Sequence, residues 1–242
     1  MGKLVWVIAG ATLIFVASFL AMPFLNGEKV VYSMMYGPVP AGSGMLSVTI
    51  DPLYGDSLYH VRSVMGTNRF FSLFYRINDR VSAFFTPDSF ISIRFAKSIK
   101  EGSHEERVSC NFLHDRGVVA YSDGDTVEMA PGAKDYLTTL YYVRSLGLTE
   151  NEGIELINHT DKKNYELRVE VTGRETVHTP LGEFECLVAD LVSESGGMFA
   201  RGPLKVWFTN DEKRLPIQME TKMPIGSIRA VLRKLEYGGK ED

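Results

Sequence analysis

Apolar and polar side chains alternate along most of this chain, and this alternation constrains its fold more than any other feature. It is clearest in Tyr165-Glu166-Leu167-Arg168-Val169-Glu170-Val171. Shorter runs at 46–50, 91–95, 204–208 and 215–219 repeat the pattern. Strands with one solvent-exposed face and one buried (dry) face belong to antiparallel sheets, because strands of parallel sheets are buried on both faces. The pattern therefore predicts an all-β fold with a single large antiparallel sheet.

Turn residues separate the alternating runs at the spacing of hairpins. Gly, Pro, Asn or Asp occur at 100–103, 179–182, 210–213 and 224–226. Each of these residue types favours chain reversal. The spacing predicts about eleven to thirteen strands.

Two segments have a helical pattern. Residues 69–76 are short and aromatic, and residues 134–146 follow Pro131-Gly132 with apolar residues at helical spacing. A large sheet must cover its dry face, so it can close into a barrel, fold into a sandwich, or curve as a half-barrel around the helices. Because the second helix lies between two groups of strands, we expect a half-barrel or barrel with two short helices packed on it or capping it.

The N-terminus contains an uncharged apolar run, Leu4–Leu25, preceded by Lys3. Its 22 residues suffice to cross a hydrocarbon core of roughly 30 Å as a helix. The lone Lys3 favours an orientation with the body outside the cytoplasm. An uncleaved membrane anchor and a cleaved signal peptide both remain open, since the run is long for a signal peptide and its cleavage sites are poor. We expect an exported protein, either anchored in the inner membrane facing the periplasm or free in the periplasm.

The rest of the chain is expected to form one domain. Residues 1–26 form the signal or anchor segment, residues 27–237 a single β-rich domain, and residues 238–242 a polar tail. The net charge is −4, and about −5 once Lys3 is removed with the N-terminal segment. This mild acidity, spread evenly, argues against nucleic acid and against an anionic membrane surface as partners.

No catalytic, metal or cofactor motif is found. The five histidines lack the spacing of a zinc site, and neither a nucleophile elbow nor a phosphate loop is present. We therefore expect no enzyme activity, no metal and no cofactor. Cys110 and Cys186 lie among alternating apolar residues; free buried thiols are favoured, and a disulfide between them is the alternative.

Two aromatic clusters are the candidates for a binding site. One is on the expected helix of residues 69–76, which carries more bulky side chains than one face can bury. The other is on the helix of residues 134–146, where tyrosines suit the rim of a core or cavity. The candidate apolar lining residues are Phe70, Phe71, Phe74, Tyr75, Tyr136, Leu140 and Tyr141. Ordinary core packing is the competing interpretation for both clusters.

Several segments, in order along the body, resemble a known family. The stretches that carry the resemblance are residues 28–32, 37–42, 71–80, 135–144, 179–186 and 224–227. Together they resemble the bacterial envelope family known as domain of unknown function 3108. The resemblance implies an exported, single-domain, β-rich protein of the Gram-negative envelope, with no catalytic residues to carry over.

Three functions compete on this basis. The first is a binding protein whose curved sheet holds or shuttles an apolar or lipid-like molecule. The second is a structural or assembly protein that docks onto another envelope component through a sheet edge or exposed aromatic residues. The third, a hydrolase, would require a cleft with a nucleophile and a base.

Overall fold

A computed structural model describes residues 24–53, 56–196, 203–222 and 226–238. Within them the chain forms one antiparallel sheet of 14 strands in the order β8-β7-β6-β5-β4-β3-β2-β1-β14-β13-β12-β11-β10-β9. The strands are β1 (Lys29–Tyr36), β2 (Val39–Leu53), β3 (Asp56–Thr67), β4 (Asn78–Phe85), β5 (Ser92–Glu101), β6 (His104–Leu113), β7 (Val118–Tyr121), β8 (Thr126–Glu128), β9 (Gly153–Thr160), β10 (Lys163–Thr179), β11 (Gly182–Val192), β12 (Leu204–Thr209), β13 (Pro216–Lys222) and β14 (Ser227–Glu236). The expected all-β antiparallel architecture is confirmed.

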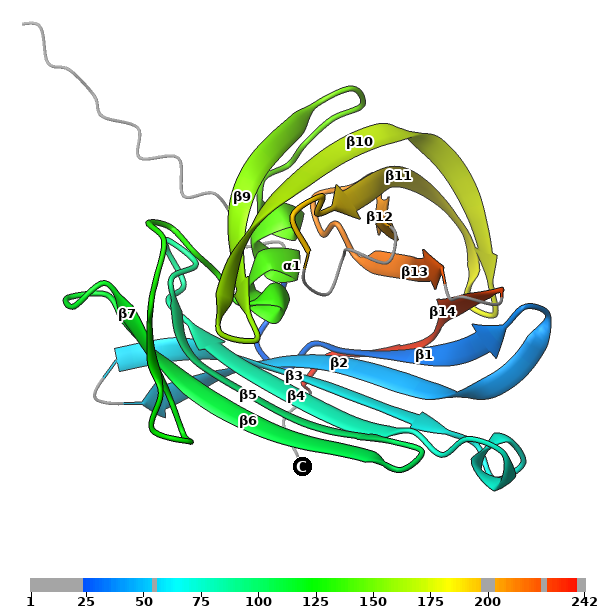
Figure 1. Cartoon of the computed structure of the whole chain (residues 1–242). Coiled ribbons are helices and arrows are strands. Elements are labelled where there is room, and N and C mark those ends of the chain that lie inside the picture. Colours follow the sequence, from blue (N-terminus) through cyan, green and yellow to red (C-terminus); the bar gives the residue numbers. More distant parts are fainter. Residues whose placement is uncertain (1–23, 54–55, 197–202, 223–225, 239–242) are drawn as a thin grey trace, which may run out of the picture.

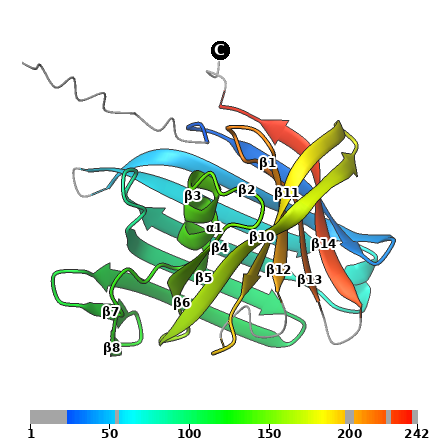
Figure 2. The same ribbon diagram turned by 90° about the horizontal axis from the view of Figure 1, so that it is seen from above.

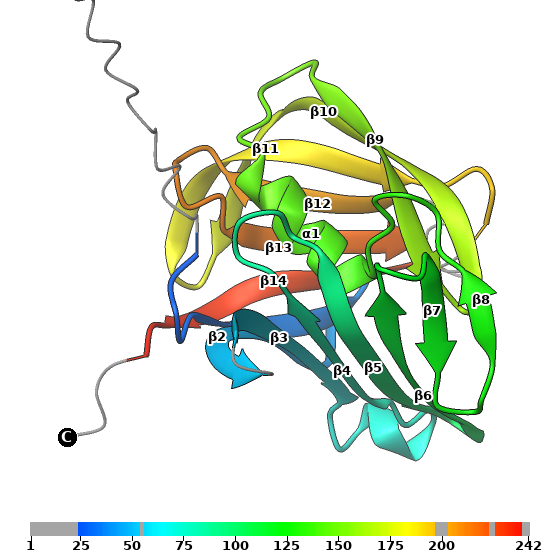
Figure 3. The ribbon, with the colours of Figure 1, turned by 90° about the vertical axis from the view of Figure 1, so that its left-hand side faces the viewer.

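The sheet curls around a single α-helix into a barrel-like shell that does not close (Figure 1). Strands β1 to β8 form one half and strands β9 to β14 the other, and β1 pairs with β14 where the two halves join. The outer edges of the shell are β8 and β9, which do not pair with each other. The helix belongs to the segment that connects these two edges, and the views of Figures 2 and 3 place it inside the curve.

The helix α1 (Tyr136–Ser145) confirms the expected helix of residues 134–146. Its N-cap is Asp135, whose carboxylate accepts hydrogen bonds from the backbone N–H groups of Leu137 (3.0 Å) and Thr138 (2.9 Å) and from the hydroxyl of Ser92 (2.7 Å). Seven of its ten residues are buried, namely Leu137, Thr138, Thr139, Leu140, Tyr141, Val143 and Arg144. A helix buried on most of its circumference fills the interior of the shell, whereas one lying on an outer face would keep a polar side.

The expected second helix, residues 69–76, is wrong. The structure has only a 3-10 turn there, η1 (Phe71–Leu73), between β3 and β4. The side chain of Asn68 accepts a hydrogen bond from the N–H of Phe71 (2.9 Å), and the hydroxyl of Ser72 donates to the carbonyl of Asn68 (2.7 Å). These local side-chain bonds favour a short turn over a continuing helix. The turn packs on no core: none of its residues is buried.

The apolar run Leu4–Leu25 lies outside the described residues except for its last two. No helix in the described parts of the chain is long and apolar enough to span a membrane. Phe24 itself belongs to the interior: it is 2% exposed, and its ring packs edge-on against Tyr59 (5.0 Å) and Tyr141 (5.0 Å). The packed body therefore includes Phe24, three residues before the expected boundary at Gly27.

A buried ion pair lies beside Phe24 and connects the start of the sheet to the helix. The guanidinium of Arg144 donates to both carboxylate oxygens of Glu28, at 2.6 and 2.9 Å, and each side chain is 1% exposed. Arg144 also donates to the carbonyl of Lys213 (2.9 Å) and lies 5.3 Å from the centre of the Phe24 ring. Fork-to-fork geometry of this kind allows two charges to be buried together, because the polar atoms on both sides gain partners.

We expect that replacing one partner of this ion pair destabilises the protein more than replacing both partners. Arg144→Met should lower the free energy of unfolding by about 3–5 kcal/mol, because it leaves the Glu28 carboxylate buried and unpaired. The double variant Glu28→Met/Arg144→Met should recover most of that loss. Urea unfolding followed by circular dichroism measures both.

The matched control is the exposed pair Lys29–Glu236, whose side chains are 42% and 34% exposed. Lys29→Ala should cost no more than about 1 kcal/mol. A double variant at Glu28 and Arg144 that is no more stable than Arg144→Met would contradict the interpretation.

The neighbouring residues Phe24 and Leu25 offer a second test. Phe24→Ala should lower the free energy of unfolding by about 3–5 kcal/mol, the usual cost of truncating a buried aromatic ring. Leu25 is 56% exposed, so Leu25→Ala should change stability by less than about 0.5 kcal/mol. Equal effects of the two substitutions in a urea titration would show that Phe24 is not part of the core.

Candidate ligand-binding site

A cavity of about 590 Å³ lies between α1 and the β9–β10 hairpin. The hairpin lines it with Leu156, Ile157 and Leu167. The helix contributes Tyr142, and the loop before the helix contributes Lys134. Leu156 and Leu167 are cross-strand partners. One wall of the cavity therefore includes β9, an edge strand of the sheet.

Lys134 carries the charge inside this cavity. Lys134 is 9% exposed. Its ammonium donates to the carbonyl of Phe90 (2.7 Å) and lies 4.8 Å from the centre of the Tyr142 ring. No carboxylate of the described residues lies within ion-pair distance of it. Burial lowers the pKa of Lys134, although the neighbouring Asp135 opposes this shift. An ammonium held by one carbonyl and one aromatic face retains N–H donors for an anionic group.

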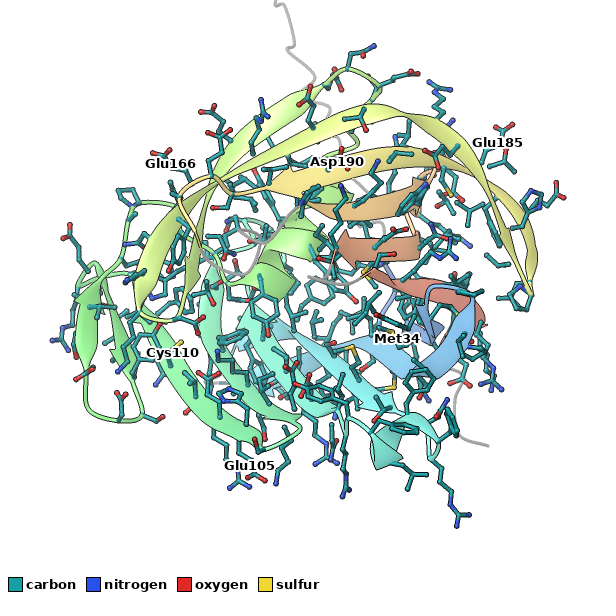
Figure 4. All side chains as sticks on the ribbon, turned by 45° about the vertical axis from the view of Figure 1, so that its right-hand side comes forward. Met34, Glu105, Cys110, Glu166, Glu185 and Asp190 are labelled. Carbon is teal, nitrogen blue, oxygen red and sulfur yellow. The ribbon has the colours of Figure 1, made fainter. Side chains whose placement is uncertain are left out.

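The mouth of the cavity is more polar than its floor. The mouth is lined by exposed charged residues, namely Glu155, Glu166, Arg168 and Glu194. Leu167 below them is 1% exposed. Figure 4 labels Glu166 on the β10 side of the shell. A site of this kind accepts an elongated molecule that is apolar along most of its length and polar at an end.

Next to the cavity, the tip of the β9–β10 hairpin bridges the gap between the two halves of the sheet. Asp161 and Lys162 form its two-residue turn, both with positive φ (49° and 64°), as a type I′ turn requires. Lys97 on β5 donates to Asp161 (2.6 Å), Lys162 donates through its ammonium to Asp123 (2.5 Å), and the Lys162 N–H donates to the hydroxyl of Tyr121 (2.9 Å). We call this set of contacts the latch.

The buried part of the latch is a hydrogen-bonded chain through His159. One ring nitrogen, Nδ1, lies 2.8 Å from Asn164 Oδ1, which can only accept, so Nδ1 carries the proton. The other, Nε2, then accepts from the hydroxyl of Tyr121 at 2.8 Å. His159 is 3% exposed, and burial lowers the pKa of its ring. Both nitrogens are occupied, so the histidine joins the two halves of the sheet in its neutral form.

The structure separates the two clusters of candidate lining residues. Tyr136, Leu140 and Tyr141 lie on α1; Leu140 and Tyr141 are buried in the core, and Tyr136 packs edge-on against Phe95 (5.0 Å). They do not line the cavity.

The η1 turn lies away from α1, at the far end of β3 and β4 (Figures 1 and 3). Phe70, Phe74 and Tyr75 are 63%, 75% and 51% exposed, and Phe71 is partly buried. These side chains cover the surface of the molecule and line no interior space.

Both cysteines are free, buried thiols. Burial raises the pKa of Cys110 and of Cys186 to about 12 in each case. Since the thiolate is the reactive form, both side chains behave as small apolar core residues. In the described ranges, no three His, Cys, Asp or Glu side chains come close enough to bind a metal ion.

The residue that sequence reasoning missed is Lys134. One local signal was present: it precedes the N-cap Asp135, where the helix dipole disfavours a cation. The facing residues Leu156 and Leu167 were recognisable only as the dry face of a strand. Their closeness to Lys134 arises from the curl of the sheet.

Together the open shell, the internal helix and the cavity define a barrel-like all-β protein with a cavity beside its helix. Residues 31–233 match the family described as Protein of unknown function (DUF3108), and the chain belongs to this family, as its sequence motifs predict.

Two solved structures align with most of the chain. The beta-barrel-like protein of domain of unknown function DUF1849 from Brucella abortus has a TM-score of 0.63 at 13% identity, over 89% of this chain and 99% of that chain. A duf1089 family protein from Pseudomonas aeruginosa has a TM-score of 0.33 at 11% identity, over 89% and 95%. The first shares the fold. No curated protein matches the sequence.

The buried histidine makes a prediction about pH. Its folded pKa is lowered from the usual 6.5, so below this pH the unfolded chain binds a proton that the native chain does not. Stability contributed by neutral His159 is therefore complete above about pH 6.5 and decreases as the pH falls through the folded value. We expect the free energy of unfolding of the wild type to fall more steeply between pH 7.5 and 5 than that of His159→Gln.

The control is His104→Gln, which replaces an exposed ring with 64% of its side chain accessible. Its pH profile should parallel that of the wild type. Parallel profiles for His159→Gln and the wild type in urea titrations would rule out the latch histidine as the source of the slope.

Proposed function

We propose that this protein binds a lipid-like molecule with an acidic end, in the cavity between α1 and the β9–β10 hairpin, and that it works without catalysing a reaction. The observation that supports this most is the juxtaposition of Lys134 with the apolar side chains of Leu156 and Leu167 in a cavity of about 590 Å³. Pockets that hold small molecules span roughly 300–1,000 Å³. A carboxylate or phosphate of the ligand would supply the counter-charge that Lys134 lacks.

The energetics favour an anionic over a neutral ligand end. A buried ammonium without a partner anion costs free energy, because it has given up water without gaining an opposite charge. A ligand that brings the anion recovers part of that cost, and its chain gains the burial of apolar surface. The glutamates at the mouth oppose an anion at the surface, so the acidic group is placed inside, at Lys134, and the chain lies along the hairpin.

A non-catalytic role agrees with the chemistry of the buried histidine and thiols, none of which lines the cavity. Both ring nitrogens of His159 are hydrogen-bonded within the protein. The thiols of Cys110 and Cys186 are buried, with a pKa of about 12. Neither kind of side chain is available for proton transfer or nucleophilic attack on a molecule in the cavity.

The location proposed for this activity is the cell envelope. The support is the uncharged run of residues 4–25 and the resemblance of the body to exported proteins. The alternative role, assembly with another envelope component, would use the exposed aromatic residues of η1 and no cavity. The two roles differ in whether a small molecule binds the isolated protein.

The decisive experiment measures binding to the chain that begins at Met22. All strand pairing and all core residues of the described body lie between Phe24 and Glu236, so this chain retains every contact of the core. Native mass spectrometry after purification without detergent should detect a bound lipid-like molecule. Displacement of the anionic fluorophore 1-anilinonaphthalene-8-sulfonate by palmitate should give its affinity.

Lys134→Met should weaken palmitate binding by about tenfold or more, the usual effect of losing a hydrogen bond to a charged group. Its binding of hexadecanol, which has no charge, should change little. Lys163→Met, which removes an exposed lysine next to the β9–β10 turn, is the matched control and should bind like the wild type.

Two outcomes would contradict the proposal. Wild-type protein that carries no lipid and binds neither probe lacks a ligand site of this kind. Equal affinities of the wild type and Lys134→Met for palmitate would show that the ligand does not lie at Lys134.

A further inference from the structure

The η1 turn and its flanking residues form an exposed surface that the ligand cavity does not use. Its apolar part consists of Phe70, Leu73, Phe74 and Tyr75, which are 63%, 79%, 75% and 51% exposed. The rings of Phe70 and Phe74 lie 5.4 Å apart, so these side chains cluster. Exposed apolar residues are common singly, but a contiguous group usually marks a site of interaction. We call this group the η1 patch.

Hydrogen bonds fix the backbone of the η1 patch to the two neighbouring turns. The backbone N–H of Asn68 donates to Ala41 (2.8 Å) and its side-chain amide to Pro40 (2.7 Å), which fixes the turn to the β1–β2 hairpin. On the other side, the N–H of Gly102 donates to the carbonyl of Arg76 (2.8 Å). An added Cβ at Gly102 would lie 2.9 Å from the ring of Tyr75, so this ring sits directly on the β5–β6 turn. The bulky side chains are thus presented on a fixed backbone.

Exposed cationic side chains lie beside the η1 patch. Arg69, Arg76 and Arg80 are exposed, and none of them takes part in an ion pair with another described residue. The acidic side chains at this end include Asp79, which is 5% exposed and accepts a hydrogen bond from the backbone of Lys100, and Glu101, which is partly buried and interacts with Asp79. A chain whose net charge is −4 therefore has a local surface that is cationic and apolar. The expectation that an anionic membrane surface is not a partner rests on the average charge and takes no account of this local surface.

We propose that the η1 patch docks onto the surface of an anionic lipid bilayer. Aromatic rings and Leu73 would enter the interface between headgroups and acyl chains, where such side chains are favoured. The arginines would pair with lipid phosphates, each contributing by attraction to the negative surface. A protein partner of matching charge would need a complementary concave surface, whereas a bilayer accepts this convex projection as it stands.

The η1 patch lies far from Phe24, the first described residue of the chain. The patch follows Thr67, which pairs with Gly42 on β2. Phe24 packs on Tyr59, which pairs with Ile50, eight residues further along β2. Eight residues of strand span roughly 27 Å. Phe24 and the patch therefore lie well apart along the shell.

Vesicle co-sedimentation of the chain that begins at Met22 tests the proposal, after a cooperative urea transition has confirmed that each variant is folded. Vesicles of phosphatidylglycerol and phosphatidylcholine should bind the wild type, and vesicles of phosphatidylcholine alone should bind it at least about tenfold more weakly. Binding should weaken further as salt is raised.

Paired variants separate the two parts of the patch. Leu73→Ser/Phe74→Ser should lower the affinity at least about tenfold, while Leu181→Ser, which alters a residue 49% exposed in the β10–β11 turn, should leave it unchanged. Arg69→Gln/Arg76→Gln should lower the affinity for anionic vesicles by about tenfold or more. The control Arg116→Gln/Arg233→Gln removes two exposed arginines elsewhere, in the β6–β7 turn and on β14, and should have little effect.

Three results would overturn the proposal: no binding of the wild type to anionic vesicles, equal binding to both kinds of vesicle, or equal loss in the patch and control variants. Patch-dependent dimers in sedimentation velocity without vesicle binding would assign the patch to a second copy of this chain. Since none of these variants alters the cavity, palmitate binding should be unchanged in all of them, so the failure of either proposal can be told from failure of the other.

Discussion

The ion pair between Glu28 and Arg144 is the interaction on which the rest of the structure depends. The two residues are separated by 116 positions, one just before β1 and the other on α1. Strand β1 pairs with β14 at the junction of the two halves of the sheet, so the pair connects that junction to the helix inside the shell. Burying both charges at this point specifies where α1 lies along the sheet, because any shift would leave one of them unpaired.

The position of α1 in turn determines the cavity. The helix covers the dry face of the strands near its own residues, through rings such as those of Phe85, Phe90 and Tyr141. At its N-terminal end the loop that carries Lys134 meets β9 through a parallel bridge between Lys134 and Asn158. The space left between this loop and the hairpin is the cavity, and the latch at the hairpin tip keeps the two edges of the open sheet together beside it.

The η1 patch shows how averages over the chain can mislead. Acidic residues outnumber basic ones, 30 to 26, which suggests a surface unattractive to anionic lipid. The acidic side chains around the β5–β6 and β9–β10 turns are largely engaged by Lys97, Lys100 and Lys162. The arginines beside the η1 turn form no ion pair with the described residues, so they give one end of the molecule exposed positive charge while the chain as a whole is acidic.

The sequence by itself determined the class of fold, the family, the turns near 100–103, 179–182 and 210–213, and the helix expected at residues 134–146. These follow from local rules: alternation with period two, residues that favour reversal, and apolar residues at helical spacing. It could not indicate that Phe24 belongs to the core, because a phenylalanine at the end of an apolar run looks the same in a membrane or in a protein interior. The helix expected at residues 69–76 failed because side-chain hydrogen bonds from Asn68 and Ser72 outweighed aromatic content.

Only the tertiary structure decided which side chains meet. The candidate residues Tyr141 and Phe74 both have the composition of a binding site, yet one is buried against Phe24 and the other is exposed on a turn. Lys134 gained its place beside Leu156 and Leu167 because the sheet curls through fourteen strands before its two edges approach each other. Contacts of that kind depend on accumulated twist and curvature, which no local pattern of residues encodes.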